Sequence, residues 1–321
     1  MKALITGGAG FIGSHLVDRL LAEDFEAIVL DDLSTGTLDN LAGVAEHPCL
    51  RIVVDDVRDE RVTSSLMEQC DLVFHLAAAV GVQLIVDEPV RTIETNIHGT
   101  EVVLAAANRF RKKVFLASSS EVYGKSEKVP FAEDDDTVLG STQFCRWSYA
   151  CSKAIDEFLA LAYSQQYELP IVIGRLFNTV GPRQTGQYGM VIPRFVEQAL
   201  RNQPLTIYGS GAQTRCFGFV GDVVGCVLDL MADKSAPGRV YNIGAEHEIS
   251  IDELADKVIE MTGSQGGKVY IPYEEAYGRK FDDMMRRAPW LERVRDQVGF
   301  EPETRLTRIL ELVIEEKKSR L

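Results

Sequence analysis

The chain lacks the residue patterns that mark metal-binding, disulfide-stabilised and membrane-spanning proteins. Its five histidines show no His-x-x-x-His spacing and its six cysteines show no Cys-x-x-Cys spacing, which argues against a metal site and against a disulfide framework. No stretch approaches the roughly 18 uninterrupted apolar residues that a membrane helix needs, and no charged leader precedes an apolar segment near Met1. We therefore expect reduced cysteines, no metal, no membrane association and a cytoplasmic location.

Positive charge is also scarce. The 34 Lys and Arg residues face 48 Asp and Glu residues, which gives a net charge of −14. Such a chain repels a phosphate backbone over most of its surface, so a nucleic acid is not expected as a partner. An anionic small molecule would have to be held by a few arginines at defined positions.

Short apolar runs alternate with helical patterns through the first half of the chain. With 321 residues, 45% of them hydrophobic, the chain can bury one large core or two fused ones. The alternation predicts βαβ units, and therefore an α/β fold built on a Rossmann-type, doubly wound parallel sheet with helices on both faces. The runs that carry this prediction are Ala3–Thr6, Ser14–Ala22, Ala27–Asp31, Arg51–Val54, Leu72–Leu76, Val90–Arg109, Val114–Ser118 and Ser148–Gln166.

The residue pattern of the sequence changes near residue 180. After Gly181, prolines and glycines punctuate shorter elements, which indicates a smaller C-terminal lobe. Strand-like runs at Ile171–Phe177 and Val240–Ile243 suggest that the chain returns to the large sheet. We therefore predict a nucleotide-binding domain over residues 1–180 with returns from about 215–245, and a substrate-binding lobe formed mainly by residues 181–321.

A glycine-rich loop lies between the first strand and the first helix. Gly7, Gly10 and Gly13 follow the buried run directly and precede the helix directly, which is the context of a dinucleotide-binding turn. The first glycine permits the tight turn, the second lets the backbone approach a pyrophosphate, and the third allows close packing of helix on strand. The helix N-terminus, with Phe11 and Ile12, offers free N–H groups to the phosphates.

Carboxylates at the ends of the next strands extend this prediction to the nucleosides. Asp31 and Asp32 end the second strand about twenty residues after the glycines. A carboxylate there accepts hydrogen bonds from the adenosine ribose and repels a 2′-phosphate, so NAD is favoured over NADP. Asp56 and Val57, after the third strand, are expected to flank the adenine, and Ser34 is placed at the same end.

Tyr149 and Lys153 stand four residues apart in a predicted helix, so they share one helical face. Free tyrosine titrates near 10, and a neighbouring cation favours the phenolate, which makes the pair a candidate general base for a sugar hydroxyl. Tyr-x-x-x-Lys alone is a common pattern. Its value here comes from the glycine loop and from the serines upstream.

Taken together, six motifs resemble the extended short-chain dehydrogenase/reductase family of sugar-nucleotide epimerases, dehydratases and decarboxylases. They span almost the whole chain: Gly7–Gly13, His75–Ala78, Ser118–Gly124, Tyr149 with Lys153, Arg175–Asn178 and Gly181–Arg183. The resemblance implies an NAD that is reduced and reoxidised within one turnover, a nucleotide-sugar substrate, most simply a UDP-sugar, and a homodimer built on the helices at Val90–Arg109 and Ser148–Gln166.

The resemblance also assigns site residues. Ser119 would hydrogen-bond the reacting hydroxyl beside Tyr149, while Lys153 would also hold the nicotinamide ribose, and Glu121 would be either a structural hydrogen-bonding residue or a further acid or base. Additional cofactor contacts fall on Leu76, Ala77, Ala78 and Asn96. Substrate contacts fall on Ser120, Asn178, Arg183, Met190, Tyr208, Arg215 and Arg287, with Arg215 at the diphosphate and Arg287 at the sugar.

The first choice among the family's reactions is 4-epimerisation through a 4-keto sugar. The keto sugar must turn so that hydride returns to its other face, and the small residues Ala78, Ala79 and Gly81 suit that movement. The alternative is decarboxylation of UDP-glucuronate, because the decarboxylases share Ser120-Glu121, the run ending at Arg215, and an Arg-x-Pro at Arg287. Against it stands Met190, where those enzymes carry an arginine, since a desolvated carboxylate needs a paired cation.

Two other possibilities are weaker. Dehydratases of the family usually carry Thr-Asp-Glu where this chain has Ser119-Ser120-Glu121, so the acid for water loss is missing. The GDP-mannose dehydratases, with Thr-Ser-Glu, are nearer at that triplet, but the run from Tyr208 to Arg215 is similar to the UDP- and dTDP-sugar enzymes. A non-catalytic NAD-binding regulator would tend to lose the Tyr or the Lys, and both are present.

Overall fold

The computed structural model describes residues 1–186, 189–277 and 284–320. Within them, seven parallel strands form one sheet in the order β11-β6-β5-β4-β1-β2-β3. The strands are β1 (Lys2–Thr6), β2 (Glu26–Asp31), β3 (Leu50–Val54), β4 (Leu72–His75), β5 (Lys113–Ser119), β6 (Ile171–Leu176) and β11 (Arg239–Ile243). The predicted Rossmann-type α/β fold is confirmed.

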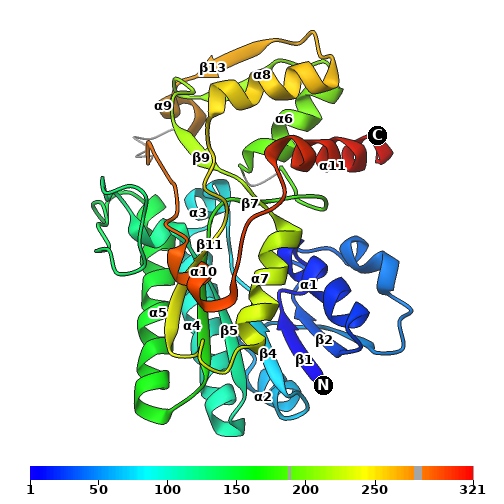
Figure 1. The fold of residues 1–321 in the computed structure, drawn as a ribbon, viewed down its shortest axis with the longest axis vertical. Helices are drawn as coiled ribbons and strands as arrows, with labels where there is room; N and C mark the ends of the chain where they lie inside the picture. Colours follow the sequence, from blue (N-terminus) through cyan, green and yellow to red (C-terminus); the bar gives the residue numbers. More distant parts are fainter. Residues whose placement is uncertain (187–188, 278–283, 321) are drawn as a thin grey trace.

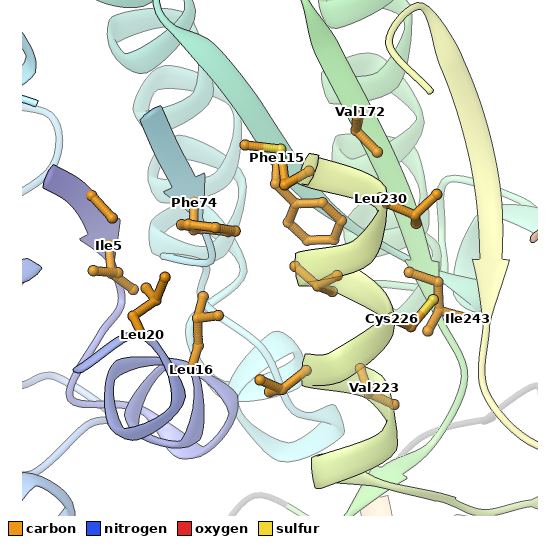
Figure 2. Close-up of a cluster of buried hydrophobic side chains, with 14 of the residues drawn as sticks. Ile5, Leu16, Leu20, Phe74, Phe115, Val172, Val223, Cys226, Leu230 and Ile243 are labelled. Atoms are coloured by element: carbon orange, nitrogen blue, oxygen red, sulfur yellow. The ribbon is translucent and has the colours of Figure 1, made fainter. Parts of the chain in front are cut away.

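Helices cover both faces of this sheet. On one face lie α1 (Phe11–Ala22), α7 (Val220–Ala232) and α10 (Glu292–Val298), and on the other lie α2 (Glu60–Glu68), α4 (Pro89–Phe110) and α5 (Arg146–Tyr167). Successive strand residues point to opposite faces, so Ile5 packs under α1 and α7 whereas Leu4 packs under the other layer. Because both faces are covered, central strands such as β1 and β6 are buried at almost every position. Figure 2 shows the core beneath α1 and α7.

A smaller lobe sits above the carboxyl ends of these strands (Figure 1). It has its own core, which includes Phe195, Leu254 and Ile309. Its helices are α6 (Val191–Leu200), α8 (Ile251–Thr262) and α11 (Leu306–Ser319), and its paired strands are β8 (Leu205–Tyr208) with β13 (Lys268–Ile271) and β9 (Thr214–Cys216) with β12 (Glu248–Ser250).

Short elements complete the described chain. The pair β7 (Thr179–Val180) and β10 (Gly218–Phe219) lies between the two lobes, and the remaining helices are η1 (Leu38–Val44), α3 (Val82–Asp87), η2 (Ser120–Tyr123) and α9 (Tyr273–Tyr277). Strand order reverses between β1 and β4, and ligands of doubly wound sheets bind outside the carboxyl ends of the strands at such a point.

Three further features bear on the sequence-based expectations. Over the described ranges, no helix is both long and apolar enough to cross a membrane. In the same ranges, no three or more His, Cys, Asp and Glu side chains gather where they could hold a metal ion. All six cysteines are free thiols.

Candidate active site

One cavity of about 840 Å³ runs from the glycine loop along the carboxyl ends of the sheet to the smaller lobe. Its lining brings together every predicted site residue except Asn96. Asn96 is buried instead: its side chain accepts the backbone N–H of Ala79 at 2.8 Å and donates to the Ser152 hydroxyl at 3.1 Å. Asn96 thus supports the cavity wall at Ala79 from behind.

The glycine loop has the form that a dinucleotide requires. Gly7 has a φ of +73°, and a Cβ on Gly13 would lie 2.1 Å from the carbonyl oxygen of Gly7. Helix α1 begins after Gly10 with no side chain capping its first N–H groups. Those groups line the cavity at Phe11 and Ile12, so the residues present fit the pyrophosphate of NAD.

The strand-end carboxylates occupy the adenosine end of the cavity. Asp31 accepts the backbone N–H groups of Ala9 and Leu33, each at 2.9 Å. Burial raises the pKa of Asp31, and these two hydrogen bonds oppose that rise. Asp32 accepts the backbone N–H of Ser34 at 2.9 Å. Asp56 pairs with Arg58, whose hydrogen bonds lower the pKa of the Asp56 carboxyl.

The predicted catalytic residues meet at the middle of the cavity. Ser119 ends β5, and Tyr149 and Lys153 project from the first two turns of α5. The side chain of Ser119 accepts the backbone N–H of Glu121 at 3.2 Å and also hydrogen-bonds Tyr149. Lys153 Nζ donates to Asp156 Oδ2 at 3.0 Å. Ser120, next to Ser119, is 1% exposed.

The pKa of Tyr149 departs from the sequence-based expectation. Burial raises it above its ordinary value, and the nearby carboxylates of Glu121 and Asp156 raise it further. The hydrogen bond from Ser119 and the charge of Arg287 lower it. The downward shift expected from Lys153 is therefore not seen, because desolvation of the phenolate outweighs the favourable contacts.

Glu121 is held between two arginines, and we call these three residues the sugar-end cluster. Arg287 Nη2 lies 2.8 Å from Glu121 Oε1, and Arg146 Nη2 lies 3.5 Å from Glu121 Oε2. The side chains are between 5% and 14% exposed, and all three line the cavity. Both guanidiniums therefore lie beside this carboxylate at the cavity wall, where an arginine can also contact an anionic group of a ligand.

Arg146 is the main residue that the sequence analysis missed. It lies three residues before Tyr149 and seven before Lys153, so it shares their helical face. That spacing could have identified it. Its position in the first turn of α5 brings it over the Trp147 ring and beside Glu121.

The smaller lobe supplies the remaining predicted contacts. Asn178 donates to the carbonyl of Cys216 at 3.0 Å, Arg183 Nη2 pairs with Asp18 at 2.7 Å, and Arg215 Nη1 donates to the carbonyl of Met284 at 2.9 Å. Met190 and Tyr208 also line the cavity. The sequence analysis missed Arg194, whose guanidinium lies 4.2 Å from the centre of the Tyr208 ring.

Arg175, in the family-like motif that begins near the end of β6, has structural contacts. Its guanidinium binds the Glu157 carboxylate at 2.7 Å and the carbonyl of Glu133 at 3.1 Å. Glu157 also accepts the hydroxyl of Ser118, the neighbour of Ser119. This buried network fixes α5 against β5 and β6, and with them the spacing of Ser119, Tyr149 and Lys153.

Comparisons with known proteins agree with this geometry. The profile of the family described as GDP-mannose 4,6 dehydratase matches residues 4–313. The chain is 40% identical over 302 residues to the UDP-N-acetyl-alpha-D-glucosaminuronate decarboxylase of Bacillus cytotoxicus, which covers 94% of this chain and 92% of that protein. It is 36% identical to UDP-glucuronic acid decarboxylase 6 of Arabidopsis thaliana, covering 100% of this chain and 90% of that protein.

Two solved structures are similar over the full length. The UDP-glucose 4-epimerase of Thermotoga maritima, solved with UDP-glucose, superposes with a TM-score of 0.89 at 30% identity, covering 100% of this chain and 99% of that one. The UDP-glucuronic acid 4-epimerase of Bacillus cereus, in complex with UDP-glucuronic acid and NAD, gives a TM-score of 0.90 at 27% identity and covers 100% of both chains.

Proposed function

Since the chain belongs to the GDP-mannose 4,6-dehydratase family of NAD-dependent sugar-nucleotide enzymes, we propose that it decarboxylates a UDP-linked hexuronate, with UDP-N-acetylglucosaminuronate as the first candidate. The observation that carries this proposal is the sugar-end cluster, in which Arg146 and Arg287 flank Glu121 beside Tyr149. Sequence reasoning placed epimerisation first because the small residues at 78–81 suit a turning keto sugar and because Met190 stands where the decarboxylases carry an arginine. Arg146 weakens that objection, since it brings a second buried cation to the same end of the cavity.

The cofactor is NAD, and the glycine loop, the N-terminus of α1 and Asp31 would hold it. When bound, it accepts a hydride from the sugar and returns it in the same turnover. Tyr149 takes the proton of the C4 hydroxyl as that hydride leaves, with Ser119 orienting the hydroxyl. Lys153 stabilises the phenolate and holds the nicotinamide ribose.

The ketone at C4 makes the C6 carboxylate a β-keto acid. The C5–C6 bond then breaks, carbon dioxide leaves, and the electron pair of that bond passes to C5 and the C4 oxygen as an enolate. A proton must return to C5 before hydride returns to C4 and Tyr149 gives its proton back to the C4 oxygen. We assign the pairing of the C6 carboxylate and the delivery of the C5 proton to the sugar-end cluster, whose members flank Tyr149.

A 4-epimerase is the second candidate. The small residues Ala78, Ala79 and Gly81 line the cavity beside the catalytic residues, and they leave room for a keto sugar to turn. The similarity to the two solved 4-epimerase structures also favours this second candidate. The two reactions share the oxidation at C4 and differ in whether C6 is lost.

Product analysis separates the two candidates. The purified protein, with no NAD added, is incubated in turn with UDP-N-acetylglucosaminuronate, UDP-glucuronate, UDP-glucose and UDP-N-acetylglucosamine, and the products are identified by NMR. We expect a UDP-pentose and released carbon dioxide from a uronate, and no product from the two neutral sugars. A six-carbon 4-epimer as the main product of any of them would overturn decarboxylation and support epimerisation.

We also propose a homodimer formed through α4 and α5, which lie side by side in Figure 1. Apolar side chains on the outer surfaces of these helices are exposed, with Phe158 71% and Val90 66% accessible, and Ile155 continues the α5 surface. A partner subunit would cover them. Sedimentation equilibrium tests this, and a monomer at micromolar concentration would contradict it.

A further inference from the structure

Lys153 forms an ion pair with the buried carboxylate of Asp156. Its ammonium donates to Asp156 Oδ2 at 3.0 Å, one turn further along α5, and the two side chains are 3% and 1% exposed. Lys153 lines the cavity, so the ammonium stands between the cavity and Asp156. The carboxylate does not reach the ligand space, and whatever it does for the reaction passes through Lys153.

Besides the Glu157 carboxylate, which binds Arg175, polar groups of α4 and β4 surround this ion pair. Helix α4 contributes Thr100, whose hydroxyl lies 3.2 Å from His75 Nε2, and His75 Nδ1 lies 2.7 Å from the Thr6 hydroxyl. Burial, with a contribution from Lys153, lowers the pKa of His75 to about 3. The imidazole is therefore neutral at physiological pH. Burial raises the pKa of Asp156, and the charge and hydrogen bond of Lys153 oppose that rise.

We propose that Asp156 is a positioning residue for the reaction: it anchors Lys153 at the floor of the cavity and offsets part of the ammonium charge there. An ammonium has three donors. One is committed to Asp156, and two remain for the cofactor ribose and the neighbourhood of Tyr149. The sequence analysis did not single out Asp156, and the inference holds for any reaction that begins with oxidation at C4.

The consequence falls on Tyr149, four residues before Lys153. A cation whose charge is offset by a neighbouring carboxylate stabilises a phenolate less well than an isolated cation does. Asp156 accordingly acts to raise the pKa of Tyr149. The other charged or titratable groups that face these residues are Glu157 on α5, His75 on β4, Glu121 on η2 and Arg287 from the smaller lobe.

The test compares two variants that both remove the negative charge of Asp156. Asp156→Asn retains an oxygen that can accept from Lys153, and Asp156→Ala removes both the charge and the anchor. Spectrophotometric titration of tyrosinate in the NAD-loaded protein, taken as the difference between each protein and its Tyr149→Phe counterpart, isolates the ionisation of Tyr149 and needs no substrate. We expect Tyr149 to ionise about one pH unit lower in both variants than in the wild type.

The pH dependence of kcat is the second readout, and its acid limb should move to lower pH by the same amount. Glu133→Gln is the matched control, because Glu133 is a buried carboxylate that accepts the backbone N–H of Asn242 outside the cavity. This control should leave both readouts unchanged even if it lowers stability. An unchanged or higher ionisation pH of Tyr149 in the Asp156 variants would overturn the proposal. Failure of the uronate assay alone would count against the proposed function and not against this inference.

Discussion

Replacement of Tyr149 with phenylalanine is expected to lower kcat by about 10²–10⁴-fold, the range that a positioned general base contributes. The phenol ring is 6% exposed and packs in the wall of the cavity, so phenylalanine fills the same volume. What is lost is the hydroxyl that exchanges a proton with the C4 oxygen. NAD should remain bound, because we propose that the glycine loop holds its phosphates and Asp31 its adenosine.

The measurement is single-turnover kinetics with NAD content determined on the same sample. Tyr163→Phe is the matched control, since Tyr163 lies on the same helix and packs against Tyr167 with ring centres 5.4 Å apart. That variant should turn over at the wild-type rate. Wild-type-like activity in Tyr149→Phe would show that Tyr149 is not the general base. Loss of NAD from the variant would mean that its low activity results from poor cofactor binding.

Replacement of Arg287 with methionine is expected to lower kcat/KM for a UDP-hexuronate by about 30–5000-fold. Truncating one partner of a buried, hydrogen-bonded charge pair costs roughly 2–5 kcal/mol, much of which comes from the charge left behind. Here Glu121 would lose its ion-pair partner at 2.8 Å, and the cavity would lose a buried cation that we propose pairs with the C6 carboxylate.

The neighbouring residue provides the control for this variant. Arg286 is 56% exposed and pairs with Glu248 at the surface, so Arg286→Met should change kcat/KM little. Arg287→Lys should fall between the wild type and Arg287→Met, because an ammonium restores the charge without the planar, forked geometry of the guanidinium. Equal activity of Arg287→Met and Arg286→Met on the uronate would exclude the sugar-end cluster from the reaction.

Local sequence patterns predicted the fold, because strand burial and tight turns depend on residues that are close together in the sequence. The run Ala3–Thr6 is buried at every position because both faces of the sheet are covered, and the glycines at 7 and 13 mark a turn that any side chain would obstruct. Helical spacing placed Tyr149 and Lys153 on one face, whereas Ser119 was added to them by the family resemblance.

What the sequence could not supply is the identity of partners across the cavity. Glu121 and Arg287 are 166 positions apart, and their ion pair depends on how the smaller lobe seats on the large sheet. The pKa direction of Tyr149 was wrong for a related reason. The spacing of Tyr149 and Lys153 is visible in the sequence, but the burial of the phenol and the carboxylate of Asp156 behind the lysine are not. Arg146 was accessible to helical periodicity and was overlooked.

The most direct test of the account follows the hydrogens through one reaction in deuterium oxide. A UDP-hexuronate is converted by the purified protein, and the product is examined by NMR for deuterium at each sugar carbon. Loss of C6 with protonation at C5 and internal return of hydride predicts a UDP-pentose that carries one deuterium at C5 and none at C4. A six-carbon product without deuterium on its ring carbons would contradict decarboxylation.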